Sequence, residues 1–223
     1  MARRKFRRLP RHIGVIPDGN RRWAVNQGLA KESGYEKGLE PGLMLYELCL
    51  ELGINELTFY GFTQDNTKRP AIQRKAFQQA CVEGVQLLCH RDASLLVVGD
   101  TSSPMFPPEL LPYTQRHTFG RDLMKLNFLV NYGWLWDLQY AIKAHGPDLL
   151  NNGKLMNFIA SKDISRIDLI VRWGDRRRLS GFLPVQSIYA DFYVVEDLWP
   201  DFKPEHFYQA LRWYEAQDVT LGG

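Results

Sequence analysis

The chain has 223 residues, of which 45% are hydrophobic, and a formal net charge of +3 at neutral pH. This length suits one large domain or two small ones, and the hydrophobic content is enough for a substantial core. No apolar run reaches the ~20 residues that a membrane-spanning helix needs. The sequence also lacks the Walker loop and the GxGxxG, CxxC, HExxH and Gly-x-Ser-x-Gly motifs, which excludes several common chemistries.

Residues 1–11 contain six basic side chains and no acidic one, so the rest of the chain carries a formal charge of +3 − 6 = −3. We expect a flexible basic tail over residues 1–11 and one domain over residues 12–223. The tail lacks the apolar segment of a secretory signal. It is either simply solvated or loosely attracted to anionic lipid. The remaining residues show no basic face, which argues against nucleic-acid binding.

The three cysteines, Cys49, Cys81 and Cys89, lie in apolar helical segments without the spacing of metal ligands. This pattern predicts reduced core residues in a cytoplasmic protein. A tail that meets anionic lipid would add a loose association with a membrane surface.

Hydrophobic periodicity predicts strands that alternate with helices along the chain. Strands are expected over residues 13–16, 55–62, 94–99, 125–131 and 167–171, and helices from residue 21 and over residues 45–52, 77–88, 107–121, 135–145 and 204–216. The polar, glycine-rich residues 28–42 predict a mobile connection. We expect a single α/β domain with an open, mainly parallel sheet of about six strands and helices on both faces. In such sheets, ligands bind at the carboxyl ends of the strands.

The first candidate site is the segment HIGVIPDGNRRWA, residues 12–24. A strand, a tight turn and a helix start form the geometry in which backbone N–H groups hold a phosphate. Gly19 allows close backbone approach, Asn20 can cap the helix, and Arg22 brings a positive charge. Asp18 would repel a phosphate unless Mg²⁺, which binds carboxylate and phosphate oxygens together, lies between them. The alternative is a simple Asx turn that leads into a helix.

A second polar cluster, Thr63, Asp65, Asn66 and Arg69, follows the strand predicted over residues 55–62. Taken alone, it is either ordinary loop chemistry or a binding site for a polar ligand at a strand end.

A third cluster contains four arginines, Arg172, Arg176, Arg177 and Arg178, around the end of the strand predicted over residues 167–171. Clustered like charges destabilise a fold unless an anion is present, so this group predicts an anionic ligand.

These segments resemble the signatures of the cis-prenyltransferase family, the undecaprenyl diphosphate synthases. HIGVIPDGNRRWA is similar to the family's Asp-Gly-Asn-x-Arg core, which is followed by an aromatic residue and Ala. Residues 60–70 resemble its Tyr-Ala-Phe-Ser-x-Glu-Asn-Trp-x-Arg-Pro block, and residues 168–182 its Arg-x-Gly-Gly-Glu-x-Arg-Leu-Ser-x-Phe block. Residues 186–193 and 198–202 extend the resemblance, which covers nearly the whole chain. Residues 12–223 would then form a cis-prenyltransferase domain.

The resemblance implies an enzyme that condenses isopentenyl diphosphate with an allylic diphosphate, such as farnesyl diphosphate, to a Z-polyprenyl diphosphate. It implies Mg²⁺ as cofactor and a homodimer. Catalytic roles would fall to Asp18, Asn20 and Asn66, and the Mg²⁺ ligands would be Asp18 and Asp191, the latter reaching across the dimer. Substrate binding is implied for Gly19, Arg21, Arg22, Trp23, Lys31, Tyr35, Thr63, Asp65, Thr67, Arg69, Arg172, Arg178 and Ser180. Among these residues, Arg172, Arg178 and Ser180 would bind isopentenyl diphosphate.

The chain departs from the family pattern at several of these positions. Lys31 and Thr220 stand where the family has Arg, and Arg176 and Asp191 stand where it has Glu. The family's His is Tyr35 here, its Trp is Thr67, and its second Gly is Asp175. Arg176 either adds a phosphate contact or pairs with Asp175. The substitutions keep two alternatives open: a synthase of the same fold that makes a short or branched prenyl diphosphate, and a non-catalytic subunit of a two-component enzyme. The growing chain needs an apolar tunnel, for which the helical stripes at residues 45–52 and 77–88 are candidates unless they are plain core.

Overall fold

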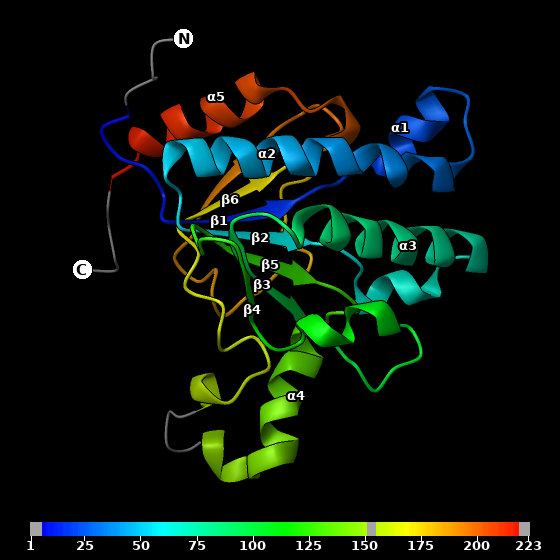
Figure 1. The fold of residues 1–223 in the computed structure, drawn as a ribbon, viewed down its shortest axis with the longest axis vertical. Helices are drawn as coiled ribbons and strands as arrows, with labels where there is room; N and C mark the ends of the chain where they lie inside the picture. The colour runs from blue at the N-terminus through cyan, green and yellow to red at the C-terminus, as the bar shows by residue number, and fades with distance from the viewer. Residues whose placement is uncertain (1–5, 151–154, 219–223) are drawn as a thin grey trace.

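The computed structural model describes residues 6–150 and 155–218, which form one seven-stranded sheet in the order β4-β3-β5-β2-β1-β6-β7 (Figure 1). All neighbouring strands pair in parallel except β4, which is antiparallel to β3. The strands are β1 (His12–Ile16), β2 (Glu56–Tyr60), β3 (Ala93–Val98), β4 (His117–Phe119), β5 (Lys125–Leu129), β6 (Leu169–Arg172) and β7 (Asp191–Val194). The expected single α/β domain with an open, mainly parallel sheet is confirmed, with seven strands where about six were expected.

The helices between the strands are α1 (Asn20–Asn26), α2 (Leu39–Leu52), α3 (Ala71–Leu88), α4 (Trp134–His145) and α5 (Pro204–Glu215). Short 3₁₀ turns join them: η1 (Lys31–Gly34), η2 (Glu36–Gly38), η3 (Gln64–Lys68), η4 (Pro108–Tyr113), η5 (Pro147–Leu150), η6 (Leu155–Asn157) and η7 (Trp199–Asp201). In Figure 1, α2 and α5 lie along one face of the sheet, and α4 extends away from its β3–β4 edge.

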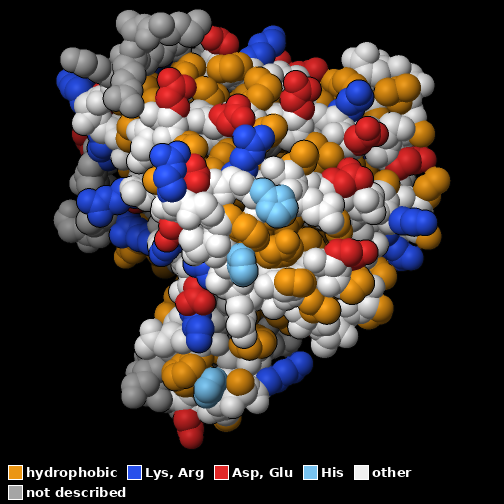
Figure 2. Space-filling view, viewed as in Figure 1, with side chains coloured by type: hydrophobic (Ala, Val, Ile, Leu, Met, Phe, Trp, Pro, Cys, Tyr) orange, Lys and Arg blue, Asp and Glu red, His pale blue; other side chains and the backbone are white. Residues whose placement is uncertain are grey.

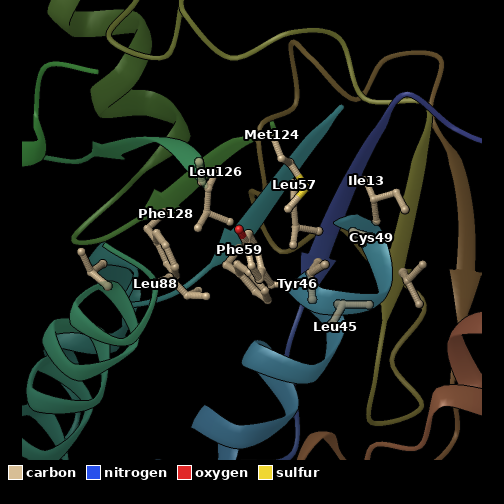
Figure 3. Packing of buried hydrophobic residues seen from close by; sticks show 14 of the residues in the cluster. Ile13, Leu45, Tyr46, Cys49, Leu57, Phe59, Leu88, Met124, Leu126 and Phe128 are labelled. Atoms are coloured by element: carbon tan, nitrogen blue, oxygen red, sulfur yellow. The ribbon is translucent and has the colours of Figure 1, made fainter. Parts of the chain in front are cut away.

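Alternation along the buried strands divides the core into two layers. Ile13 and Val15 of β1 pack into the cluster that α2, α3 and α5 cover, whereas Ile16 belongs to the cluster on the opposite face. Figure 3 shows Leu45, Tyr46 and Cys49 of α2 directed at the first of these layers. The helical stripe at residues 45–52 is therefore core.

The structure corrects the helix expected over residues 107–121. Only the 3₁₀ turn η4 forms there, followed by the short edge strand β4. Pro107, Pro108 and Pro112 explain the difference, because proline removes a backbone donor and clashes with the preceding turn of an α-helix.

The mobile connection expected over residues 28–42 is instead mostly ordered structure. η1 packs on α1 so closely that a Cβ added at Gly34 would lie 2.0 Å from the backbone oxygen of Asn20. Glycine is required here because only it allows the two backbones to approach this far. The expectation missed this packing because polar composition alone does not reveal a close backbone contact.

The described part of the basic tail, from Phe6 onward, packs against α5. The ring of Phe6 stacks on Tyr208 with centroids 6.5 Å apart, and Arg8 donates hydrogen bonds to the carbonyls of Tyr214 and Gln217. These contacts place residues 6–11 against the domain, the flexibility expected over residues 1–11 stays a prediction, and residues 1–5 lie outside the described residues.

A buried polar network ties the amino ends of β1, β2 and β5 together. His12 Nε2 lies 2.8 Å from the hydroxyl of Thr58, and Asn127 donates to Glu56 at 2.8 Å and to Thr58 at 2.9 Å. Burial lowers the pKa of His12. Burial alone would raise the pKa of Glu56, but His12 and hydrogen bonds from Ser165 and Asn127 hold that pKa below its ordinary value.

We expect acid to destabilise the fold through this network. Both groups bind fewer protons in the folded state, so the unfolded chain gains protons as the pH falls below the ordinary His pKa of 6.5. Each group can contribute a slope of up to about 1.4 kcal/mol per pH unit in the free energy of unfolding. In His12→Gln the slope between about pH 6.5 and about pH 5 should flatten in urea-unfolding measurements. His90→Gln, at an exposed histidine, is the matched control; an unchanged slope in His12→Gln would contradict the prediction.

Candidate active site

The carboxyl ends of β1, β2 and β6 open onto one polar cavity with a volume of about 780 Å³. Asp18 follows β1, Thr63 follows β2, and Arg172 ends β6. In the sheet, β1 lies between β2 and β6, so the connections that follow β1 and β6 lead to opposite sides of this point. It is therefore a topological switch point of the sheet. Such points are where open α/β sheets bind ligands.

Most of the residues singled out from the sequence line this cavity. They are Asp18, Gly19, Asn20, Arg21, Arg22, Lys31, Tyr35, Thr63, Asp65, Asn66, Arg69, Arg172, Arg178 and Ser180. Arg176 also lines it. Segments separated by more than 150 residues of sequence therefore converge on one space.

An ion pair between Asp18 and Arg172 forms part of the cavity wall. A terminal nitrogen of Arg172 donates to Asp18 Oδ2 at 2.8 Å, and Arg22 approaches Oδ1 at 3.6 Å. The side chain of Arg172 is only 4% exposed, whereas that of Asp18 is 33% exposed. A buried guanidinium needs an anionic or strongly polar partner, and here Asp18 provides it.

The loop after β6 folds back over this ion pair. Arg172 donates to the Ser180 hydroxyl at 2.9 Å and to the backbone oxygen of Arg178, and Arg22 donates to the carbonyl of Gly174 at 2.7 Å. Gly174 has a φ of 85°, and a Cβ there would lie 2.4 Å from the Arg22 guanidinium. The loop thus requires glycine where Arg22 passes it.

The first turn of α1 also faces the cavity, but its cap differs from the expectation. Gly19, with a φ of 114°, is the N-cap residue, and Asn20 is the first residue of α1. The Asn20 amide donates back to the carbonyl of Pro17 at 3.0 Å and so braces the turn that presents Asp18.

The loop after β2 is braced in a similar way. Asn66 Oδ1 accepts a hydrogen bond from the Thr63 backbone N–H at 3.1 Å in a capping box that starts η3. Asp65 pairs with Lys68 at 3.0 Å on the outer surface of the same turn.

Positive charge dominates the cavity. In the part of the chain that the structure describes, seven cationic side chains line it: Arg21, Arg22, Lys31, Arg69, Arg172, Arg176 and Arg178. The acidic lining residues there are Asp18 and Asp65. Such a cavity suits ligands that carry several negative charges and fork-shaped oxygen pairs, which arginine binds through two parallel hydrogen bonds.

Three of the residues expected to serve the substrates or metal lie elsewhere. Trp23 donates to Asp201 at 2.9 Å and so joins α1 to η7, and the Thr67 hydroxyl donates to the carbonyl of Gln64 at 2.6 Å and closes η3. Asp191 begins β7 opposite Leu169, at the amino end of the sheet and so at the end away from Asp18. Thr220 lies outside the described residues.

A small apolar pocket of about 90 Å³ adjoins the polar cavity between α2 and α3. Its walls include Leu39, Gly42 and Leu43 of α2, Phe77, Ala80, Cys81, Gly84 and Leu88 of α3, and Phe59 and Phe128 of the sheet. Figure 3 shows Leu88 close to Phe128 at this face of the sheet. The stripe at residues 77–88 is therefore partly a pocket wall.

Sequence reasoning missed the α2 side of this pocket. The apolar residues Leu39 and Leu43 precede the segment that was expected to be helical, and α2 begins six residues earlier than expected, at Leu39. Gly42 lies between these two leucines, and the absence of a side chain there leaves room beside the helix. This glycine is the signal that could have indicated a pocket next to α2.

The side chains of the cavity fit an Mg²⁺ ion that is held partly by a protein carboxylate and partly by the phosphates of a bound substrate. No group of three or more His, Cys, Asp or Glu residues that could hold a metal occurs within residues 6–150 and 155–218. Magnesium is commonly held by one or two carboxylates together with substrate phosphates. Asp18, a partly exposed carboxylate in a mainly cationic cavity, suits that mode of binding.

The sequence matches a family model described as "Putative undecaprenyl diphosphate synthase" over residues 16–222. The chain belongs to this family. A ditrans,polycis-undecaprenyl-diphosphate synthase ((2E,6E)-farnesyl-diphosphate specific) of Pectobacterium atrosepticum is 30% identical over 96% of this chain and 90% of that protein. An isoprenyl transferase of Heliobacterium mobile is 31% identical over 97% of this chain and 88% of that protein.

The fold is also found in a solved structure. Lavandulyl diphosphate synthase from Lavandula x intermedia, in complex with dimethylallyl diphosphate, aligns with a TM-score of 0.81 and 21% identity over 96% of this chain and 98% of that chain. The expected membership of the undecaprenyl diphosphate synthase family, and with it the expectation of a prenyltransferase, is confirmed.

We expect Arg172→Gln to weaken the binding of inorganic pyrophosphate at least tenfold. Truncating a buried, hydrogen-bonded charge costs ~2 kcal/mol or more in binding. Calorimetric titration in metal-free buffer measures the change, and a thermal melt checks the fold of the variant. Arg121→Gln, at an exposed arginine that pairs with Asp92 at 2.8 Å, is the matched control. Equal affinity of wild type and Arg172→Gln would show that pyrophosphate binds elsewhere.

Proposed function

We propose that this chain condenses isopentenyl diphosphate with an allylic diphosphate, forming a prenyl diphosphate with a new cis double bond. One observation carries the proposal: Asp18 and Arg172 meet at 2.8 Å in a cationic cavity that adjoins an apolar pocket. The cavity suits two diphosphate groups and the pocket suits a hydrocarbon tail. The names of the bacterial relatives, which specify farnesyl diphosphate, support this reaction class.

Arg172, Arg178 and Ser180 would hold the diphosphate of isopentenyl diphosphate. Arg172 and Ser180 are already joined at 2.9 Å, so their donors are oriented before the substrate arrives. Holding the alkene against the electrophilic carbon is a positioning effect, which can supply a large part of a rate enhancement.

The allylic diphosphate would lie at the start of α1, against Gly19, Asn20 and Arg22, with Lys31 beside them. As the carbon–oxygen bond breaks, its electron pair leaves with the diphosphate, and fixed cations stabilise the developing negative charge. Asp18 would hold Mg²⁺, which when bound would neutralise part of this charge.

Besides the diphosphate that leaves, the condensation releases a proton from isopentenyl diphosphate as the new double bond forms, and the departing diphosphate can accept it. Thr63 and Asn66 line the cavity beyond the carboxyl end of β2 and would face this step, with Asp65 beside them. Asn66 is held in place by the Thr63 backbone N–H, which makes it the better fixed of these side chains.

A second candidate function is the synthesis of a short or branched prenyl diphosphate. The apolar pocket favours it, because about 90 Å³ is less than the ~150 Å³ of a cavity that binds benzene. A non-catalytic role is not favoured, because Asp18, Gly19 and Asn20 are in place in the cavity.

We further propose a homodimer in which Asp191 reaches the partner's site. Asp191 lies on the edge strand β7, and the nearby Ile188 and Tyr189 are exposed. This accounts for a site residue that a single chain places far from Asp18.

We also propose a cytoplasmic protein that meets membranes only at their surface. The three cysteines are free and buried, as expected for a reducing compartment. Within the described residues, no helix is long and apolar enough to cross a membrane. Figure 2 shows acidic and basic side chains interspersed where α2 and α5 lie, which supports the absence of a nucleic-acid-binding surface on that face.

We expect Asp18→Ala to abolish turnover in a protein that still folds, with a lower melting temperature because Arg172 loses its anionic partner. The assay follows incorporation of labelled isopentenyl diphosphate with Mg²⁺ and C5, C10, C15 or C20 allylic primers. In metal-free buffer the variant should still bind pyrophosphate, because a repelling carboxylate has been removed, but added Mg²⁺ should no longer strengthen that binding.

Asp148→Asn, at an exposed aspartate on η5, is the control for a lost carboxylate. Retention of more than a few per cent of the activity by Asp18→Ala would remove Asp18 from the proposed role. Long products, short products or no incorporation by the wild type would distinguish the three candidate functions.

The dimer proposal predicts complementation between two inactive variants. Mixing Asp18→Ala with Asp191→Ala after mild dissociation should produce heterodimers in which one of the two sites has both carboxylates. Random pairing would then restore about a quarter of the wild-type activity. Light scattering reports the dimer, and no recovery in a confirmed mixture would contradict a role for Asp191 across the interface.

A further inference from the structure

The boundary between the polar cavity and the apolar pocket is built from a few residues that line both. They are Pro17, Asn20, Tyr35, Tyr60, Gly61 and Phe77. Any ligand with a diphosphate in the cavity and a tail in the pocket must pass between these side chains. Tyr35 and Phe77 are the members of this set that face each other across the junction of η1 and α3.

Tyr35 is fixed in place on two sides. Its ring is parallel to that of Phe77, with an interplanar angle of 1° and centroids 4.5 Å apart, and only 5% of the residue is exposed. Arg69 donates a hydrogen bond to the Tyr35 hydroxyl at 2.9 Å and also lies over the Phe77 ring at 5.5 Å. Burial raises the pKa of Tyr35, so the hydroxyl that accepts from Arg69 stays neutral.

The size of the pocket makes this boundary restrictive. At about 90 Å³ it has less room than the ~150 Å³ cavity in which benzene binds. Each further five-carbon unit of a tail therefore requires side chains at the boundary or along α3 to move. Close-packed interiors resist such movement, and added methylene groups in a filled core are destabilising.

We propose that Tyr35, held against Phe77 by Arg69, determines how readily a long allylic tail enters the apolar pocket. Tyr35 is then a specificity-determining residue, and Arg69 is a positioning residue that acts through it. The inference rests on the proposed prenyl transfer and names the feature of the substrate, the length of its tail, that this part of the site selects.

The test compares dimethylallyl (C5) and farnesyl (C15) substrates in the full-length protein. Wild type, Tyr35→Ala, Tyr35→Phe and Phe77→Ala are assayed for kcat/KM with labelled isopentenyl diphosphate. We expect Tyr35→Ala and Phe77→Ala to raise the C15-to-C5 ratio of kcat/KM at least tenfold. Tyr35→Phe keeps the ring, so its ratio should stay within about threefold of the wild-type value. Tyr140→Ala, at a tyrosine exposed on α4, is the control for loss of a ring.

Two results would overturn the proposal. An unchanged ratio in Tyr35→Ala would show that the ring does not restrict the tail. An equal rise in Tyr35→Phe and Tyr35→Ala would show that freeing Arg69, and not removing the ring, changes the preference. If Tyr35→Ala fails to fold in a thermal melt, Phe77→Ala decides the question by the same ratio.

Binding measurements separate this proposal from the reaction on which it rests. Calorimetry with unreactive C5 and C15 allylic thiolodiphosphates gives a ratio of dissociation constants without turnover. Absence of incorporation with every primer would overturn the proposed reaction, while the effect of Tyr35→Ala on the binding ratio would still support or overturn the boundary role.

Discussion

The hydrogen-bonded ion pair between Arg172 and Asp18 holds the site together. Arg172 is almost wholly buried at the end of β6, and a guanidinium in that position is costly without an anionic partner. Asp18 provides this partner from the turn after β1, so the pair joins two neighbouring strands where both leave the sheet. The same guanidinium orients Ser180 and the loop after β6. A diphosphate that enters the cavity meets donors already in position, which lowers the ordering cost of binding.

The sheet order explains why polar and apolar chemistry meet at this point. Strand ends supply the charged loops, and the helices that cover one face supply the pocket wall. α2 and α3 both pack on that face, and Gly42 and Gly84 keep space between them. A Cβ at Gly84 would lie 3.5 Å from Leu39, an ordinary contact, so the pocket is narrow without being strained. A head group and a tail can thus be bound by different layers of one domain.

The sequence allowed most of this arrangement to be predicted, for identifiable physical reasons. Asp18 and Arg172 follow buried apolar runs, and the carboxyl ends of parallel strands meet at one edge, so their convergence follows from the strand pattern. The contact between Tyr35 and Phe77 does not, because it depends on how closely η1 approaches α1 and α3. Helical periodicity also gives the same signal for Leu45 and Cys49, which are core, as for Ala80 and Cys81, which line the pocket. The position of Asp191 could not be judged from one chain, since its proposed site belongs to a partner.

The charge balance of the cavity links stability to binding. Arg69 and Arg22 are partnered mainly by neutral groups, the Tyr35 hydroxyl and the Gly174 carbonyl, and Arg21 donates to Gln73 at 3.4 Å. Like charges gathered in this way repel one another, and Asp18 offsets only part of the repulsion. A ligand that binds the folded state alone stabilises it by mass action. The cluster of arginines thus lowers the stability of the free protein, and an anion with several charges that occupies the cavity raises it again.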